Sequence, residues 1–245
     1  MAETGKATAD VFADTDAEQK YTVSPERKAR RTLVDRTNMQ AVYDAKPCAY
    51  KLIKRIADVV LSAGALAALS PVFAITSLAI VIEDGRPVIY AAPREGQNGK
   101  PFKMYKFRSM YRDAESKLQE LLEQNEQTGP AFKIKDDPRI TRVGRFIRRA
   151  SIDELPQLVN IIRGDMSIVG PRAIQRTQEY TPYETQRLVV QPGLTCYWQV
   201  SGRANIDWEE WVELDLDYIQ DMSILTDIKL IAKTFGAVLE GEGGY

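Results

Sequence analysis

The chain contains no histidine, and this absence excludes several kinds of enzyme at once. Without imidazole there is no Ser-His-Asp or Cys-His catalysis, no histidine general base and no histidine metal ligand. The two cysteines, Cys48 and Cys196, are far apart and form no C-x-x-C pair, which argues against a disulfide framework or a zinc ribbon. The available chemistry is that of carboxylates, lysines, arginines and hydroxyls, with a hard, oxygen-bound cation such as Mg²⁺ as the natural metal.

A strong overall charge is also absent. The 245 residues include 33 basic and 34 acidic side chains, a net charge of -1, which does not favour a polyanion as partner. A chain of this length buries one core, with room for an appendage. Residues 133–149 are the local exception, with seven basic and two acidic side chains. This run is typical of a solvated face, a nucleic-acid surface or an anion site, and its single aromatic residue argues against nucleic acid.

Residues 1–45 lack sustained hydrophobic periodicity, so the sequence predicts a mobile polar and basic arm there. The arm has no apolar stretch of the kind that marks a signal peptide. Arg27, Lys28, Arg30 and Arg31 form a small basic cluster near its end. Such a cluster is either solvated or, beside a membrane, in contact with anionic headgroups.

The longest uncharged run extends from Val59 to Ile82, 24 residues in all, within a predicted membrane segment at 46–85. At about 1.5 Å per residue, a helix of this length crosses a hydrocarbon core of about 30 Å. Ser70 and Pro71 divide the run into halves, and basic residues flank both ends, which places both ends on the cytoplasmic side. These features leave two alternatives open: a kinked spanning helix, or a re-entrant helix hairpin in which Ser70 bonds backbone groups freed by the proline.

Residues 86–245 are predicted to form one small, helix-rich α+β catalytic domain. Residues 87–90 and 102–107 read as the strands of a short β-hairpin around the turn at 96–99. Helical periodicity follows at 113–126, 208–222 and 227–239. The apolar stripes of the last two helices face a core or, on a protein held at a bilayer, lie in the membrane interface.

Residues 151–164 form the most informative stretch, a short amphipathic helix that ends at Gly164. With Asp153 as the N-cap, Pro156 falls at the third helical position, where its missing N–H has no consequence. This arrangement places Asp153 and Glu154 at the positive end of a helix, which also suits phosphate. The alternative is that both residues are ordinary capping and dipole partners.

Several motifs then resemble the bacterial sugar transferase family, whose members are monotopic polyprenyl-phosphate phosphoglycosyl transferases. The resemblance covers about residues 50–245, in the family's order, and is closest to the short-form members. The motifs are K-R-I-A-D at 54–58, Ser70-Pro71, N-G-K-P-F-K-M-Y-K-F-R-S-M at 98–110, D-P-R-I-T at 137–141, S-I-D-E-L-P-Q-L at 151–158, G-D-M-S-I-V-G-P-R at 164–172, P-G-L-T at 192–195 and W-Q-V-S-G-R at 198–203.

The resemblance implies transfer of a sugar 1-phosphate from a UDP-sugar to undecaprenyl phosphate, releasing UMP, at the cytoplasmic face of the inner membrane. It implies Asp153 as the nucleophile of a covalent aspartyl-phosphosugar intermediate and Glu154 as a ligand of Mg²⁺. It also implies a re-entrant hairpin broken at Ser70 and Pro71, in contact with membrane lipids. The implied phosphate-binding cations are Arg148, Arg172, Lys106 and Arg108.

The sequence departs from the family pattern at Ala92 and Pro93, where Gln-Glu is usual before Arg94, and at Ala173, Cys196 and Met222. None of these positions falls on the acidic pair, although the altered loop predicted around Ala92 bears on substrate or lipid contacts. The competing hypothesis is a non-catalytic membrane scaffold of a polysaccharide assembly complex. The identity of the sugar, the pathway, the role of the arm and the formation of a homo-oligomer stay open.

Overall fold

The computed structural model describes residues 25–32, 34–117, 137–176, 178–201 and 206–239. Within them the fold is α+β, as the sequence predicts, with helices as the dominant element. The α-helices are α1 (Pro25–Arg31), α2 (Met39–Asp44), α3 (Cys48–Ala68), α4 (Ser70–Asp84), α6 (Arg142–Arg149), α7 (Gln157–Arg163), α8 (Trp208–Asp221) and α9 (Ile224–Leu239). The 3₁₀ helices are η1 (Gln97–Gly99), η3 (Ile152–Glu154), η4 (Glu184–Val189) and η5 (Trp198–Val200).

The strands make two small sheets. β1 (Ile89–Glu95) pairs antiparallel with β2 (Pro101–Phe107) on one side and with β4 (Ile174–Gln175) on the other. β3 (Ser167–Val169) pairs in parallel with β5 (Gly193–Thr195). The hairpin expected around residues 96–99 is confirmed, although its first strand begins and ends later than predicted. Ala92 therefore lies in a strand, where it is 5% exposed, and not in a loop.

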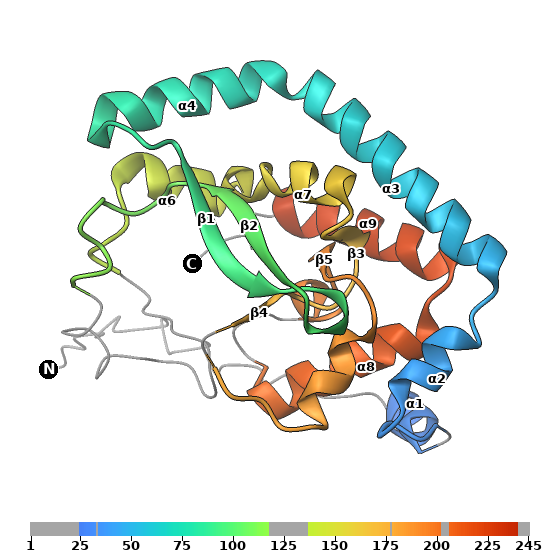
Figure 1. The fold of residues 1–245 in the computed structure, drawn as a ribbon. Coiled ribbons are helices and arrows are strands. Elements are labelled where there is room, and N and C mark those ends of the chain that lie inside the picture. Colours follow the sequence, from blue (N-terminus) through green and yellow to red (C-terminus); the bar gives the residue numbers. More distant parts are fainter. Residues whose placement is uncertain (1–24, 33, 118–136, 177, 202–205, 240–245) are drawn as a thin grey trace, which may run out of the picture.

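The elements are stacked in layers (Figure 1). α3 and α4 form an arch along one side of the molecule, and α6, α7 and the hairpin lie beneath it. α8, α2 and α1 lie at the opposite side from α4. One core cluster fills the space between the hairpin and α7, from the apolar side chains of Ala92, Met104, Leu158, Ile161 and Met166. The acidic pair of the sequence precedes α7 and thus lies in the layer below the arch.

The break predicted at Ser70 and Pro71 separates α3 from α4, whose axes meet at a bend of 61°. Pro71 lies in the first turn of α4, where a missing N–H is tolerated. The hydroxyl of Ser70 donates to the carbonyl of Ala67 at 2.9 Å, the carbonyl four residues before the proline. This bond is the one the sequence predicts, because Ala67 would otherwise have bonded the N–H that Pro71 lacks.

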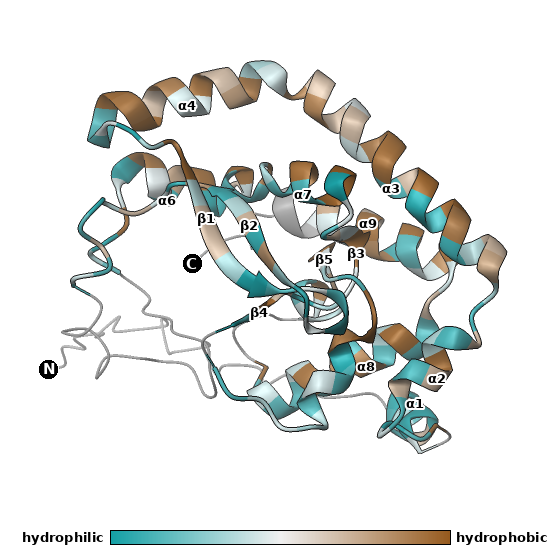
Figure 2. Ribbon diagram, in the orientation of Figure 1, coloured by the Kyte–Doolittle hydropathy of each residue, from teal (hydrophilic) through white to brown (hydrophobic). Residues whose placement is uncertain are grey.

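Among the described residues no single helix is long and apolar enough to cross a bilayer, whereas α3 and α4 meet that length and composition test as a bent pair. Figure 2 shows much of both helices in brown, the colour of hydrophobic residues, and several of their large apolar side chains are exposed. The most exposed of these are Leu52, Ile53, Ile56, Val60, Leu61, Ile75, Leu78 and Ile82. Exposed apolar side chains gathered on two successive helices are typical of a surface that contacts a membrane or another protein.

Polar contacts fasten the first half of α3 to α7. Arg55 donates through its two terminal nitrogens to the carbonyls of Ile161 (2.7 Å) and Ile162 (2.9 Å), at the C-terminal end of α7. Asp58 accepts the backbone N–H of Ile168 at 3.0 Å. These bonds satisfy helix-end carbonyls that have no partner within α7, and they fix α3 against the element that follows the acidic pair.

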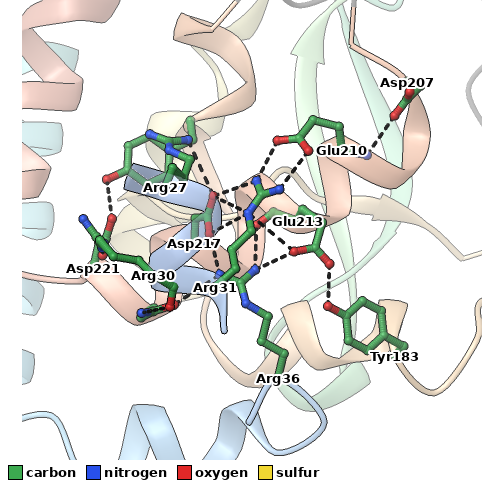
Figure 3. A network of polar contacts seen from close by, with 12 residues as sticks. Arg27, Arg30, Arg31, Arg36, Tyr183, Asp207, Glu210, Glu213, Asp217 and Asp221 are labelled. Carbon is green, nitrogen blue, oxygen red and sulfur yellow. Dashed lines mark hydrogen bonds and ion pairs between the residues drawn. The ribbon is translucent and has the colours of Figure 1, made fainter. Parts of the chain in front are cut away.

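Part of the predicted mobile arm is structured. α1 and α2 are helical, and the arginines of the predicted basic cluster are paired with acidic side chains of α8 (Figure 3). Arg36 contacts Asp217 at 2.5 Å and Glu213 at 2.7 Å, and Arg31 contacts Asp217 at 2.9 Å. The hypothesis that the cluster is merely solvated is therefore wrong for Arg30 and Arg31, because both are bonded to α8. The boundaries of the three predicted units stay a prediction.

The last two helices agree closely with their predicted ranges. The apolar stripe of α8 faces the core, where Val212, Leu216 and Ile219 are almost completely buried. Its tryptophans point inward as well, since Trp211 is 7% exposed and Trp208 is half-buried. α9 instead exposes Leu225, Ile228 and Phe235. Of the two helices, only α9 therefore has an apolar surface suited to a membrane interface. The helix predicted at 113–126 falls mostly outside the described residues.

The two cysteines differ in exposure. Cys48 is the first residue of α3 and is exposed, whereas Cys196 follows β5 and is completely buried. Burial raises the pKa of the Cys196 thiol to about 12. No disulfide joins them, as the sequence indicates.

Candidate active site

Asp153 and Glu154 lie in the 3₁₀ helix η3, just before α7 begins at Gln157. The predicted helix start is therefore wrong, because Pro156 occupies the N-cap of α7 and Asp153 lies in a separate tighter turn. Ser151 enters that turn with a φ of 54°, a left-handed conformation that is uncommon outside glycine. Neither helix start has a side-chain capping bond, so the Asp153 carboxylate is not engaged as a cap. Gly164 ends α7 in the left-handed region, as predicted.

Lys106, near the end of β2, faces both carboxylates. Its ammonium nitrogen lies 2.7 Å from Oε1 of Glu154 and 3.9 Å from Oδ2 of Asp153. Arg172 approaches from the segment before β4, with its guanidinium 3.7 Å from the same Glu154 oxygen. Three separated stretches of the chain, all singled out in the sequence, thus meet at the acidic pair.

Asp153 is 7% exposed, and this burial determines its protonation behaviour. Burial raises the pKa of Asp153, and the neighbouring Glu154 carboxylate raises it further. Lys106, Arg148 and Arg172 act in the opposite direction and favour the charged form. The net pKa of Asp153 is raised, and the three cations limit that rise.

Arg148 reaches the site because α6 packs closely on the end of the hairpin. Gly144 makes this contact possible, since a Cβ atom there would lie 1.9 Å from the carbonyl oxygen of Ser109. One turn later, Nε of Arg148 donates to the hydroxyl of Ser109 at 2.8 Å. Burial lowers the pKa of Arg148, and the nearby Asp153 carboxylate counteracts this. Ser109 and Gly144 are therefore supporting residues that the motif reading did not single out.

The structure places Arg108 elsewhere. Its guanidinium donates to the carbonyls of Asp84 (3.0 Å) and Gly85 (2.7 Å) and pairs with the Asp84 carboxylate at 3.1 Å. These contacts hold the C-terminal end of α4, and among the described residues none joins Arg108 to the acidic pair. The sequence grouped Arg108 with Lys106, but β2 ends at Phe107, so Arg108 lies beyond the regular strand and its side chain need not follow the face of Lys106. The observed contacts give Arg108 an anchoring role, and phosphate binding by this residue stays a prediction.

Asn160 is a further supporting residue, which the apolar spacing in α7 did not identify. It is completely buried in α7, among apolar positions, and its amide bonds the backbone of β2. Oδ1 accepts the N–H of Tyr105 at 2.9 Å, and Nδ2 donates to the carbonyl of Lys103 at 2.8 Å. This bridge fixes β2, which carries Lys106, against the helix that follows the acidic pair. A buried amide in an apolar helix face was the signal available in the sequence.

The residues at the site fit Mg²⁺ only together with a phosphate-bearing ligand. Among the described residues no group of three or more metal-binding side chains occurs. Mg²⁺ is commonly held by one or two carboxylates plus substrate phosphates and water, which matches an adjacent Asp and Glu. Glu154 is the better protein ligand of the two, since it is the less buried carboxylate.

Comparison with known proteins assigns the chain to a family. The sequence model that describes the bacterial sugar transferases matches residues 49–241. The chain belongs to the bacterial sugar transferase family. The match leaves out α1 and α2, which lie before residue 49.

Individual relatives carry compatible names. The chain is 49% identical over 164 residues to a galactosyl transferase, CpsE, of Streptococcus agalactiae, covering 66% of this chain and 36% of the relative. It is 43% identical over 202 residues to an undecaprenyl-phosphate galactose phosphotransferase of Salmonella typhimurium, covering 80% and 42%. It is also 41% identical over 198 residues to the exopolysaccharide production protein ExoY of Sinorhizobium fredii, covering 78% and 88%. The chain thus spans less than half of the first two relatives and most of the third.

Proposed function

We propose that this chain transfers a sugar 1-phosphate from a UDP-sugar to undecaprenyl phosphate, giving undecaprenyl-diphosphate-sugar and UMP. The proposal is supported by membership of the family and by relatives named for phosphotransfer to undecaprenyl phosphate and for exopolysaccharide production. In this role the chain carries out the first membrane step in the synthesis of an exopolysaccharide, capsule or O-antigen.

The environment of Asp153 supports the mechanism. Its side chain is nearly buried and is not used as a helix cap, and its Oδ2 atom lies 3.9 Å from the ammonium nitrogen of Lys106. A carboxylate in this setting attacks without a general base, which suits a chain that has no histidine. In the first step an Asp153 oxygen bonds to the phosphorus next to the sugar. The bond from that phosphorus to the bridging oxygen breaks, and its electron pair leaves with UMP.

In the second step a phosphate oxygen of the lipid attacks the same phosphorus. The bond to Asp153 breaks, and its electron pair returns to the carboxylate, so the enzyme is regenerated with no net proton transfer. Lys106 and Arg172 stabilise the charge that develops on the phosphate oxygens in both steps. Mg²⁺, when bound through Glu154 and the donor phosphates, neutralises part of the diphosphate charge.

The bent helices α3 and α4 form a re-entrant hairpin in this proposal, with the catalytic domain at the cytoplasmic face of the inner membrane. Support comes from the 61° bend and from the exposed apolar side chains of the arch (Figure 2). A hairpin holds the site at headgroup depth, where the lipid phosphate is accessible to a water-soluble donor. Cysteines placed at Lys51 and Arg86 should react with an impermeant thiol reagent from the same side, after replacement of Cys48. Reaction from opposite sides would establish a spanning helix instead.

The nucleophile is tested by trapping. Purified full-length protein incubated with a panel of UDP-sugars, without lipid, should gain the mass of one phosphosugar with the correct donor, located on Asp153. Asp153→Asn should abolish both the adduct and the lipid product. Asp113→Asn is the matched control, because Asp113 is an exposed carboxylate that also pairs with a lysine, Lys117, at 2.7 Å.

Turnover without any adduct would favour direct attack by the lipid phosphate on the donor. Absence of both adduct and turnover with every donor would favour the scaffold hypothesis. The Asp153→Asn protein should unfold at the same temperature as the wild type. Its loss of adduct and of lipid product is then a loss of chemistry and not of folding.

A further inference from the structure

Within the described part of the chain, Arg94 has no anionic partner. It lies on β1 two residues after the buried Ala92, and side chains two apart on a strand share a face, so Arg94 points toward the core side of the hairpin. Its Nε atom is buried and has no hydrogen-bond partner. No hydrogen bond or ion pair of the guanidinium occurs among the residues that the structure describes. A buried polar group of this kind is normally satisfied, so its isolation suggests a missing ligand.

A second guanidinium lies nearby. β4 pairs with β1 with Gln175 opposite Arg94, and Arg172 comes three residues before Gln175. Burial lowers the pKa of Arg94, and the positive charge of Arg172 lowers it further. A largely buried guanidinium with a second, partly exposed guanidinium on the neighbouring segment favours an anion between them.

The carboxylates around this pair are committed elsewhere. Glu154 is bonded to Lys106 at 2.7 Å, on the other side of Arg172. Asp215 is paired with Arg187, and both side chains are completely buried. Glu95 follows Arg94 directly, so its side chain leaves the opposite face of β1. The charge of Arg94 therefore has no counter-charge in the part of the chain that the structure describes.

Arg172 is held in position between the acidic pair and Arg94. Its guanidinium lies over the ring of Trp198, 5.2 Å from the centroid, and Trp198 stacks on Trp211 at 4.3 Å. Its backbone carbonyl accepts a bond from Arg187 at 3.1 Å. Arg172 is thus held beside Glu154, and the pairing of β4 with β1 brings its segment next to Arg94, so the charged groups are ordered as a row from the acidic pair through Arg172 to Arg94.

We infer that Arg94 and Arg172 form the subsite for the phosphate that leaves with the nucleoside, an inference that rests on the proposed function. A diphosphate placed with its first phosphorus at Asp153 and extended along the row brings its second phosphate between the two guanidinium groups. When the bridging bond breaks, the new negative charge develops on that phosphate. Arg94 then stabilises the leaving group and binds the nucleoside monophosphate product.

The test measures binding of UMP and of uridine to full-length protein in detergent, by calorimetry and by thermal shift. Wild-type protein should bind UMP more tightly than uridine. Arg94→Gln should weaken UMP binding about 10- to 100-fold and leave uridine binding unchanged. Arg94→Lys, which keeps the charge but loses the fork, should fall between them. Arg176→Gln is the matched control, because Arg176 is an exposed arginine just beyond β4.

The inference also predicts how Arg94→Gln changes stability. Because this change removes an unpaired, desolvated charge, the unfolding temperature of the free protein should be unchanged or raised, and UMP should no longer stabilise the variant. A purely structural role for Arg94 predicts the opposite: lower stability of the free protein and normal UMP binding. The inference is overturned if Arg94→Gln lowers the stability of the free protein and binds UMP normally. It is also overturned if wild-type protein does not prefer UMP to uridine, or if Arg176→Gln has the same effect.

The inference and the proposed function fail in distinguishable ways. UMP binding does not require the nucleophile, so Asp153→Asn should bind UMP like the wild type while forming no product. If UMP binding depends on Arg94 but no phosphosugar is transferred, the subsite is supported and the proposed reaction is rejected.

Discussion

Around the acidic pair, the cations Lys106, Arg148 and Arg172 outnumber the two carboxylates, whereas between residues 27–36 and α8 four arginines meet four carboxylates (Figure 3). The balanced group consists of Arg27, Arg30, Arg31 and Arg36 with Glu210, Glu213, Asp217 and Asp221. In a balanced group each charged side chain is paired with an opposite charge of the same group, and these ion pairs hold two segments of the chain together. A group with excess cations needs a negative ligand to complete it, so the same residue types serve structure in one place and binding in the other.

If this comparison holds, a charge removed at the site should reduce turnover with little effect on stability. Lys106→Met should lower kcat about 10³-fold, equivalent to ~4 kcal/mol of transition-state stabilisation, because Lys106 faces both carboxylates and the reacting phosphate. Its free energy of unfolding should change by less than about 1 kcal/mol. Lys117→Met, at an exposed ion pair, serves as control for both measurements. A large loss of stability in Lys106→Met would contradict the comparison.

The reverse result is expected at the centre of the balanced group. Asp217 is 3% exposed and is contacted by Arg31 and Arg36, so Asp217→Asn leaves buried guanidinium groups without a counter-charge. Denaturant titration should show a loss of ~3 kcal/mol, with kcat of the folded fraction unchanged. Glu209→Gln, at an exposed position of the same helix, should change neither quantity. Reduced kcat in folded Asp217→Asn would mean that α8 also supports the chemistry.

At the edge of the same group the effect should be small. Arg30 is half exposed and pairs with Asp221, so Arg30→Gln should lower the free energy of unfolding by ~0.5 kcal/mol. The difference from wild type should vanish in about 1 M salt, where exposed charges are screened. If the difference persists at high salt, Arg30 contributes by packing and not by its charge.

The smallest effect is expected from Glu184, which links η4 to α8 by accepting the indole N–H of Trp208. Burial raises the pKa of Glu184, but hydrogen bonds from Trp208 and Thr181 outweigh it, so the net pKa is below its ordinary value of 4.5. A lowered pKa contributes stability that is present above the unfolded value and is lost as the pH falls through the folded value. The stability difference between wild type and Glu184→Gln should therefore shrink between about pH 6 and pH 3. A constant difference would rule out this linkage.

Local sequence patterns predicted most of the elements that carry the site. Turn residues located the hairpin, apolar spacing located α7, α8 and α9, and Ser70-Pro71 located the bend. Each of these depends on residues close together in the sequence. The start of α7 was missed because the prediction assumed one regular helix, whereas the chain uses a left-handed residue and a 3₁₀ turn before Pro156.

Long-range pairing was largely beyond the sequence. The ion pair between Arg36 and Asp217 joins residues 181 positions apart, and the polar composition of the arm does not predict it. The contact of Arg108 with the end of α4 was likewise not predictable, because the motif does not show that β2 ends at Phe107, one residue before Arg108. Arg94 was visible only as a charge, since its isolation depends on where every nearby carboxylate is directed.

The contrast between the two cysteines gives the natural chain a single addressable thiol. Cys196 is buried with a raised pKa, so an alkylating fluorophore should react at Cys48 alone in the folded protein. The label would then stand at the first residue of α3, where the arch begins. The emission wavelength of the fluorophore and its quenching by lipid-bound quenchers would measure how deeply this position of the unaltered protein enters a bilayer.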